Sequence, residues 1–193
     1  MAGPLLITGF GPFPGVPRNP TMVLATRLAR DLRLKRQGVT TALRLLPTEY
    51  AAADALIPAM IAELRPRAVL MFGVAAKRRQ VCIETRARNR LSILHPDAAG
   101  QRPHHPVLAP GQPLVLKGRA RFAPLVNDVR RARLPARISL SAGGYLCNLA
   151  YWRMLAACDV PCVFIHIPAV RNAQRMTRLV DAGVRMALRL LRA

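Results

Sequence analysis

Short apolar runs alternate with amphipathic segments along most of this chain, and the two patterns predict different elements. A continuous apolar run bounded by Gly, Pro or polar residues is typical of a buried strand, whereas apolar residues three or four positions apart predict a helix that buries one face. The expected strands are residues 5–8, 39–46, 67–72, 81–84, 136–140 and 163–167. The expected helices are residues 20–37, 47–64, 122–133, 147–157 and 173–191. This alternation predicts a single α/β domain over residues 1–193, a three-layer α/β/α sandwich with a mostly parallel, mixed central sheet.

Some of the expected helices carry signals of their own. Asn19 and Pro20 predict a helix start with Asn as the N-cap, and Leu24, Leu28 and Leu32 then form one apolar stripe. Pro58 predicts a kink or a break in the second helix. Residues 90–113 show no periodicity and predict a long irregular segment that holds at most a short hairpin. The last helix is expected to bury Met176, Val180, Val184, Ala187 and Leu191.

Residues 139–148, with the sequence Ser-Leu-Ser-Ala-Gly-Gly-Tyr-Leu-Cys-Asn, join an expected strand to an expected helix through a glycine turn. Cys147 falls in the first turn of that helix, where free backbone N–H groups and the positive end of the helix dipole favour a thiolate over a thiol. Gly143 and Gly144 allow backbone amides to approach a ligand closely. Cys147 is therefore a candidate nucleophile.

A nucleophilic cysteine needs a general base and a group that orients the base. His166 is the candidate base because it lies at the carboxyl end of an expected strand, where ligands gather in open α/β sheets. Glu84 is the best acidic candidate for the orienting role. Cysteines at helix starts serve packing more often than catalysis, so a structural interpretation of Cys147 stays open beside the catalytic one.

Composition narrows the class of protein. The chain has 193 residues, of which 52% are hydrophobic, and no apolar run reaches the length of a membrane span. The first residues lack the basic region of a signal peptide, so we expect a cytoplasmic protein with reduced cysteines. Cys158, Cys162 and His166 are spaced like a metal cluster, but no fourth ligand is evident, and we expect neither a metal nor a cofactor.

The formal net charge of +21 is extreme for an enzyme and favours contact with phosphate, nucleic acid or anionic surfaces. The basic residues are spread through the whole chain, however, and only 5% of residues are aromatic and able to stack on bases. We therefore favour a solvated basic surface over a dedicated nucleic-acid site. Phe10 and Phe13 lie in a loop rich in Gly and Pro, where they are either lids on the core or a clamp for a small flat ligand.

The chain resembles the pyroglutamyl peptidase I family of cysteine peptidases, also called pyrrolidone-carboxylate peptidases. The resemblance extends over nearly the whole chain, and its most specific parts surround Cys147 and His166. The matching stretches are Ile7-Thr8-Gly9-Phe10-Gly11-Pro12-Phe13 with Asn19-Pro20-Thr21, residues 73–84 with Asn89, Ser141-Ala142-Gly143-Gly144-Tyr145-Leu146-Cys147-Asn148, and Phe164-Ile165-His166-Ile167-Pro168.

The resemblance implies an α/β/α fold and hydrolysis of the amide bond after an N-terminal pyroglutamyl residue, without a metal or cofactor. It implies Cys147 as the nucleophile, His166 as the general base and acid, and Glu84 as the residue that orients His166. The backbone amides of Gly144 and Cys147 are then expected to stabilise the oxyanion. The substrate that the resemblance implies is a peptide or small amide with an N-terminal pyroglutamate. Because members of the family commonly form homo-oligomers, the resemblance also implies a homo-oligomer.

The same resemblance implies a substrate pocket in which Phe10 and Phe13 pack against the lactam ring, with Asn19 nearby. Val74 takes the place of a Gln or a small apolar residue of the family, and Leu94 takes the place of an arginine thought to help the oxyanion. These departures leave two alternatives beside a pyroglutamyl peptidase. One is a thiol-dependent amidase for another small acyl or cyclic amide, and the other is a non-catalytic basic scaffold that binds an anionic partner.

Overall fold

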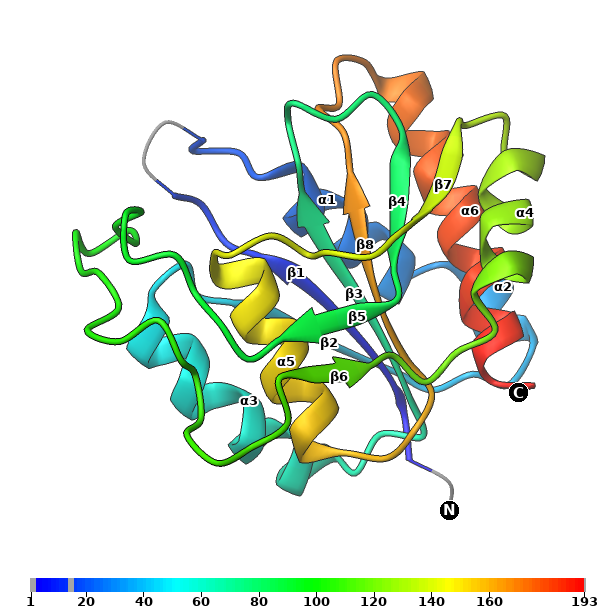
Figure 1. Ribbon diagram of the computed structural model, residues 1–193. Helices are drawn as coiled ribbons and strands as arrows, with labels where there is room; N and C mark the ends of the chain where they lie inside the picture. Colours follow the sequence, from blue (N-terminus) through cyan, green and yellow to red (C-terminus); the bar gives the residue numbers. More distant parts are fainter. Residues whose placement is uncertain (1–2, 14–15, 193) are drawn as a thin grey trace.

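The protein is built around one twisted sheet in a computed structural model that describes residues 3–13 and 16–192 (Figure 1). The sheet has six strands in the order β2-β1-β3-β8-β4-β7. Strands β2, β1, β3 and β8 are parallel, whereas β4 pairs antiparallel with β8 and parallel with β7. The strands are β1 (Leu5–Phe10), β2 (Thr41–Leu46), β3 (Ala68–Val74), β4 (Val81–Glu84), β7 (Ala136–Ser139) and β8 (Cys162–Ile167).

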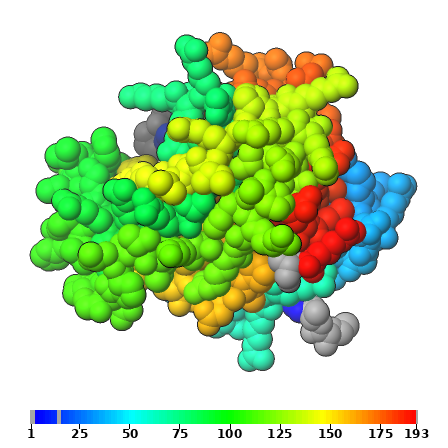
Figure 2. All heavy atoms as spheres, turned by 45° about the vertical axis from the view of Figure 1, so that its right-hand side comes forward, coloured from blue at the N-terminus to red at the C-terminus, as the bar shows by residue number. Residues whose placement is uncertain are grey.

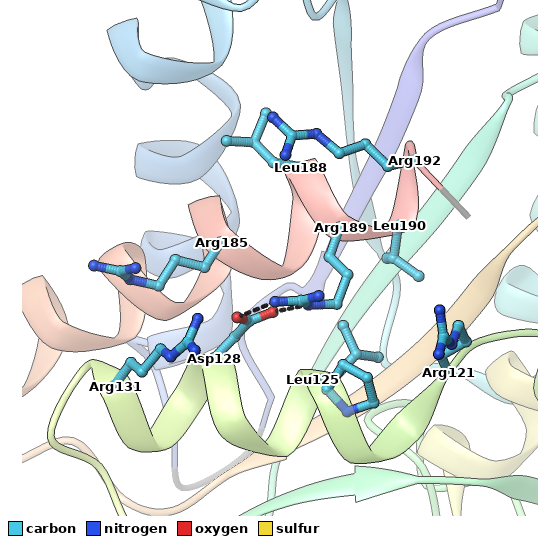
Figure 3. A pocket seen from close by; sticks show the side chains of 10 residues that line it. Arg121, Leu125, Asp128, Arg131, Arg185, Leu188, Arg189, Leu190 and Arg192 are labelled. Atoms are coloured by element: carbon cyan, nitrogen blue, oxygen red, sulfur yellow. Dashed lines mark hydrogen bonds and ion pairs between the residues drawn. The ribbon is translucent and has the colours of Figure 1, made fainter.

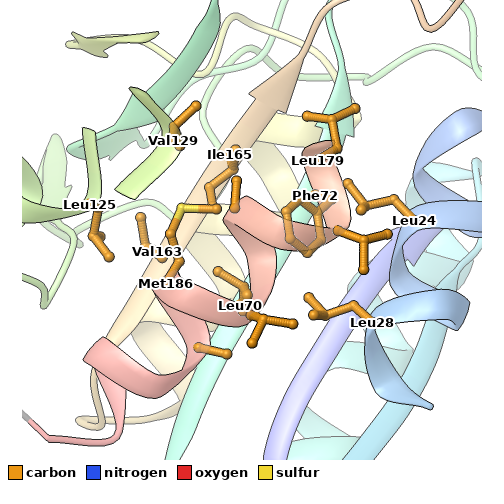
Figure 4. Packing of buried hydrophobic residues seen from close by; sticks show 14 of the residues in the cluster. Leu24, Leu28, Leu70, Phe72, Leu125, Val129, Val163, Ile165, Leu179 and Met186 are labelled. Carbon is orange, nitrogen blue, oxygen red and sulfur yellow. The ribbon is translucent and has the colours of Figure 1, made fainter. Parts of the chain in front are cut away.

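Helices cover both faces of the sheet, which confirms the predicted α/β/α sandwich. One face carries α1 (Pro20–Ala29), α2 (Leu32–Arg36), α4 (Phe122–Arg131) and α6 (Ala173–Leu190), and the other carries α3 (Tyr50–Leu64) and α5 (Leu146–Ala157). Figure 4 shows the first core, in which Phe72 and Ile165 of the sheet meet Leu24, Leu179 and Met186 of the helices. Each such fully buried side chain contributes roughly 1.5–3 kcal/mol through removal of apolar area from water.

The strand period of two divides the side chains of β8 between these cores. Val163 and Ile165 lie in the core under α6, whereas Cys162 and Phe164 lie in the core under α5. His166 has the same parity as Phe164 and therefore points to the α5 side of the sheet. This alternation determines on which face of the sheet the candidate base lies.

An irregular segment lies over the α5 side, as the sequence predicted. It is enclosed by a two-stranded antiparallel pair, β5 (Arg86–Arg88) and β6 (Val115–Lys117). Asn148 of α5 anchors its start, because the side-chain amide accepts from the N–H of Arg88 at 2.9 Å and donates to the carbonyls of Arg88 and Arg90 at 2.7 and 2.9 Å. Asn89 holds its far end through two hydrogen bonds to Ala109.

One sequence prediction about the helices is wrong, and of the kink or break predicted at Pro58 the break is contradicted. The expected stripe of α1 does not reach Leu32, which is 61% exposed, because Asp31 accepts from the N–H of Arg33 and starts the separate helix α2. Pro58 does not break α3, which is continuous from Tyr50 to Leu64. In the last helix four of the five stripe positions are buried, and Leu191 lies just past the helix end, half-buried.

Candidate active site

Cys147 is the second residue of α5, in the first turn as predicted. The preceding turn needs Gly143, whose φ of 89° lies in the left-handed region that side chains other than glycine rarely adopt. Tyr145 is the extended residue before the helix, and its carbonyl accepts the first helical hydrogen bonds, from Asn148 and Leu149. Within the described residues, the N–H groups of Gly144 and Cys147 make no backbone hydrogen bond, so both are free to bind an anion.

Gly73 at the end of β3 forms the floor beneath the thiol. A Cβ at this position would lie 2.9 Å from Cys147 Sγ and 2.7 Å from Phe164 Cζ, closer than real side chains approach. Gly73 is also the register partner of His166 on β8. The thiol therefore lies directly over the β3–β8 pair, beside the imidazole, and only glycine leaves room for it there.

Glu84 reaches His166 because β4 is antiparallel to β8. In this register Cys82 faces His166 and Glu84 faces Phe164, so Glu84 and His166 are diagonal neighbours on one face of the sheet. His166 Nδ1 lies 2.8 Å from Glu84 Oε1. Glu84 is fully buried and His166 is 4% exposed. The structure thus brings together all three residues that the sequence suggested for a triad.

The charges of this group stabilise one another. Burial alone would lower the pKa of His166, but the negative charge and hydrogen bond of Cys147, together with those of Glu84, raise it to about 9. Burial works against the ionised form of Glu84 as well, yet hydrogen bonds, above all the one from His166, lower its pKa. At neutral pH the arrangement favours an imidazolium that is paired with the Glu84 carboxylate and lies beside the Cys147 sulfur.

Arg78 is a fourth member of this network, which the sequence analysis missed. Its Nη1 lies 2.6 Å from Glu84 Oε1, the same oxygen that contacts His166. Its Nη2 donates to the carbonyl of Ser141 at 3.1 Å, so Arg78 also ties the glycine turn to the carboxylate. Arg78 lies on the turn between β3 and β4, six residues before Glu84, and no local pattern in the sequence marks it as a partner of that carboxylate.

A small, mostly apolar cavity of about 70 Å³ opens beside Cys147. It has room for about five water-sized volumes, which suits a small ring rather than a long side chain. The four pocket residues expected from the sequence all line it, and so do three that the sequence analysis did not single out. The lining residues are Phe10, Phe13, Asn19, Val74 and Cys147, joined by Thr48, Tyr145 and Leu146.

Hydrogen bonds hold the aromatic wall of this cavity in place. Asn19 caps α1 as predicted, and its Oδ1 accepts from the N–H and hydroxyl of Thr21 at 3.0 and 2.8 Å. Its Nδ2 donates to the carbonyl of Gly11 at 3.0 Å, while Thr21 Oγ1 accepts from the N–H of Phe10. The ring of Phe10 packs against Phe164, with 6.4 Å between centroids. The wall is therefore preorganised.

A second, wider cavity of about 560 Å³ lies beyond the glycine turn. Gly143 and Gly144 line it, and the carbonyl of Gly144 accepts from the N–H of Ser92 at 2.8 Å. Leu94, which is 73% exposed, lines this cavity together with Arg88 and Arg90. The position that carries an arginine in the resembled family therefore lies near the turn that precedes Cys147.

The other cysteines lie outside the site. All four cysteines are free, and Cys82 and Cys162 are buried. Burial raises the pKa of the Cys158 and Cys162 thiols, which keeps them protonated and unreactive at neutral pH.

Within residues 3–13 and 16–192 no group of three or more His, Cys, Asp or Glu side chains is arranged to hold a metal ion. In the same residues no helix has both the length and the apolar character that crossing a membrane requires.

The fold and the site define an α/β protein of the cysteine peptidase class. A family model described as pyroglutamyl peptidase matches residues 4–187, and the chain belongs to the pyroglutamyl peptidase family. A curated pyrrolidone-carboxylate peptidase of Gloeobacter violaceus is 33% identical, over 98% of this chain and 97% of the relative. Another, of Deinococcus radiodurans, is 36% identical over 86% and 78%. The crystal structure of pyrrolidone carboxyl peptidase from Thermus thermophilus covers 96% of this chain and 98% of its own, with 30% identity and a TM-score of 0.83.

Proposed function

We propose that this protein hydrolyses the amide bond after an N-terminal pyroglutamyl residue, with Cys147, His166 and Glu84 as its catalytic residues. One observation carries the proposal: a cysteine at a helix start, a buried His166–Glu84 pair and a small apolar cavity meet at one point. The relatives named pyrrolidone-carboxylate peptidase support the substrate class.

The proposed mechanism has two half-reactions, formation of a thioester and its hydrolysis. The Cys147 thiolate attacks the pyroglutamyl carbonyl, and the backbone N–H groups of Gly144 and Cys147 stabilise the oxyanion that forms. His166 then donates its proton to the leaving amine, which releases the peptide and leaves a thioester. Water, deprotonated by His166, hydrolyses the thioester and restores the thiolate. Glu84 holds Nδ1 of His166 and stabilises the imidazolium in both steps.

The cavity is suited to a neutral lactam. Phe10 and Phe13 offer apolar faces to a flat ring, and the backbone near the cavity offers polar groups for the lactam N–H and carbonyl. The side chain of Asn19 already forms three hydrogen bonds, to Thr21 and Gly11. We therefore assign it the role of holding the loop rather than of binding the lactam ring. Val74 supplies a second apolar wall.

A substrate panel tests the proposal. Pyroglutamyl amide should be cleaved, whereas the cyclopentanecarbonyl amide, which has the same ring size without the lactam N–H and carbonyl, should be cleaved far more slowly. Cys147→Ala should abolish cleavage, and Cys158→Ser should retain it as the matched control. Faster cleavage of the cyclopentanecarbonyl amide would favour the second candidate, an amidase for another small cyclic acyl group, which the apolar Val74 wall would suit.

Iodoacetamide separates an enzyme from a non-catalytic scaffold. A catalytic Cys147 should be labelled fast and selectively at neutral pH, because its thiol lies beside an imidazolium and, unlike that of Cys82, is not buried. Equal, slow labelling of Cys147 and Cys158 would contradict catalysis.

The four free thiols support a reducing compartment such as the cytoplasm. Light scattering of the purified chain would test whether it forms the homo-oligomer that the family implies.

A further inference from the structure

A concave site unrelated to Cys147 lies on the opposite side of the sheet from α5. Helix α4 and the C-terminal end of α6 lie side by side there, in lime and red in Figure 2. The groove between them has a volume of about 390 Å³ and is shown in Figure 3. Its charged lining consists of Arg121, Arg131, Arg185, Arg189, Arg192 and Asp128.

Of the described residues that line the groove, Asp128 is the only acidic one, and it neutralises the charge of only one of these arginines. Asp128 is buried, and its two oxygens accept from Nε and Nη2 of Arg189 at 2.5 and 2.8 Å. Five arginines less one aspartate leave the groove a charge of +4. Within the described residues, the other four arginines form no ion pair, and all four are exposed. The groove therefore concentrates positive charge that the described part of the chain does not neutralise.

Three of the free arginines lie at the two ends of the groove, and the fourth, Arg192, extends along α6 on the side away from α4 (Figure 3). Arg131 and Arg185 lie at one end, with the Arg189–Asp128 pair between them and Arg121 (Figure 3). Arg121 immediately precedes α4 and Arg131 is its last residue, so at 1.5 Å per residue the two ends are about 15 Å apart. A single small anion cannot reach both ends, whereas an extended one can contact both.

We propose that this groove binds a linear oligophosphate chain lying along α4 and α6. Guanidinium groups bind phosphate oxygens in a planar, two-pronged geometry, and the apolar floor formed by Leu125, Leu188 and Leu190 strengthens those contacts by excluding water. No aromatic side chain lines the groove in the described part of the chain, so nucleic-acid bases would find no stacking surface. Charge of one sign also disfavours pairing of this groove with the same groove of a second copy.

Titration of the full chain with linear polyphosphate tests the site, with inorganic sulfate at matched ionic strength as the reference. Polyphosphate should raise the melting temperature and bind with an affinity that falls as salt rises. The double variant Arg131→Gln and Arg185→Gln should weaken binding at least about tenfold and flatten the slope of log affinity against log salt by about two. These side chains are exposed and outside the active site, so cleavage of pyroglutamyl amide should be unchanged.

The matched control removes two exposed arginines elsewhere, Arg36→Gln with Arg102→Gln, which changes the net charge equally. Retained binding in this control supports the groove. Equal weakening in both double variants would overturn the proposal, because binding would then follow net charge alone. Polyphosphate no tighter than sulfate would overturn it as well. Tighter binding of a single-stranded oligonucleotide with the same number of phosphates would overturn the choice of ligand.

Discussion

Replacing Glu84 by glutamine should make the reactivity of Cys147 strongly dependent on pH. Glutamine keeps the size of the side chain but removes the charge that lies 2.8 Å from His166 Nδ1. It also leaves the guanidinium of Arg78 beside the imidazole without its carboxylate. Both changes destabilise the imidazolium, so Cys147 should react more slowly at neutral pH.

The size of the effect follows from the pKa of His166. Cys147 and Glu84 together raise this pKa from 6.5 to about 9 against the opposing effect of burial, which corresponds to about 3 kcal/mol. Glu84 supplies the smaller share, on the order of 1.5 kcal/mol, so its loss should slow the labelling of Cys147 at pH 7 about tenfold. Above pH 9 the native imidazolium itself loses its proton, so the two proteins should converge.

The assay is the rate of iodoacetamide labelling of Cys147 between pH 5 and pH 10. We expect the native protein to react about tenfold faster than Glu84→Gln near pH 7 and at nearly the same rate near pH 10. Arg78→Gln should not slow labelling near pH 7, because Glu84 Oε1 then contacts His166 alone and still stabilises the imidazolium. Arg79→Gln removes an equal charge from an exposed neighbour and should change little. A constant ratio of rates at every pH would refute the electrostatic reasoning.

Three further predictions concern the walls of the site. Gly73→Ala should destabilise the fold by about 1–3 kcal/mol in chemical denaturation and slow labelling of Cys147, because the new methyl group would overlap the thiol and Phe164. Phe13→Ala should raise KM for pyroglutamyl amide with little effect on labelling, and an unchanged KM in the folded protein would remove Phe13 from the pocket. Leu94→Arg should raise kcat if the guanidinium reaches the developing oxyanion, and an unchanged kcat would exclude that role.

Local patterns predicted most of the fold because each depends on neighbouring residues. The period of two in β8 gave the direction of His166, and the glycine turn before Cys147 gave its position in the first helical turn. The failure at Leu32 has a local cause too, since Asp31 competes as an N-cap with the continued apolar stripe. At Pro58, the packing of α3 against α5 outweighs the missing N–H.

The direction of β4 and the role of Arg78 could not be predicted in this way. Residues 81–84 read as a strand in either direction, and only pairing with β8, which lies far along the chain, selects the antiparallel one. Arg78 is one of many arginines in a chain of net charge +21, so nothing in its local sequence marks it as a partner of Glu84. Long-range pairing and side-chain direction decide both, and neither leaves a local pattern.

The position of β8 has a consequence for when the protein becomes active during synthesis. β8 is the last strand in the chain, yet it lies between β3 and β4 in the sheet. Until it enters, the strands already made form two separate parts, β2-β1-β3 and β4-β7, and Gly73 on β3 is separated from Glu84 on β4. Non-local pairing of this kind is slow and comes late, because the chain must close a long loop first. A nascent chain, or one truncated before β8, would therefore carry Cys147 without the proposed base His166, and hydrolysis would begin only once the whole sheet is closed.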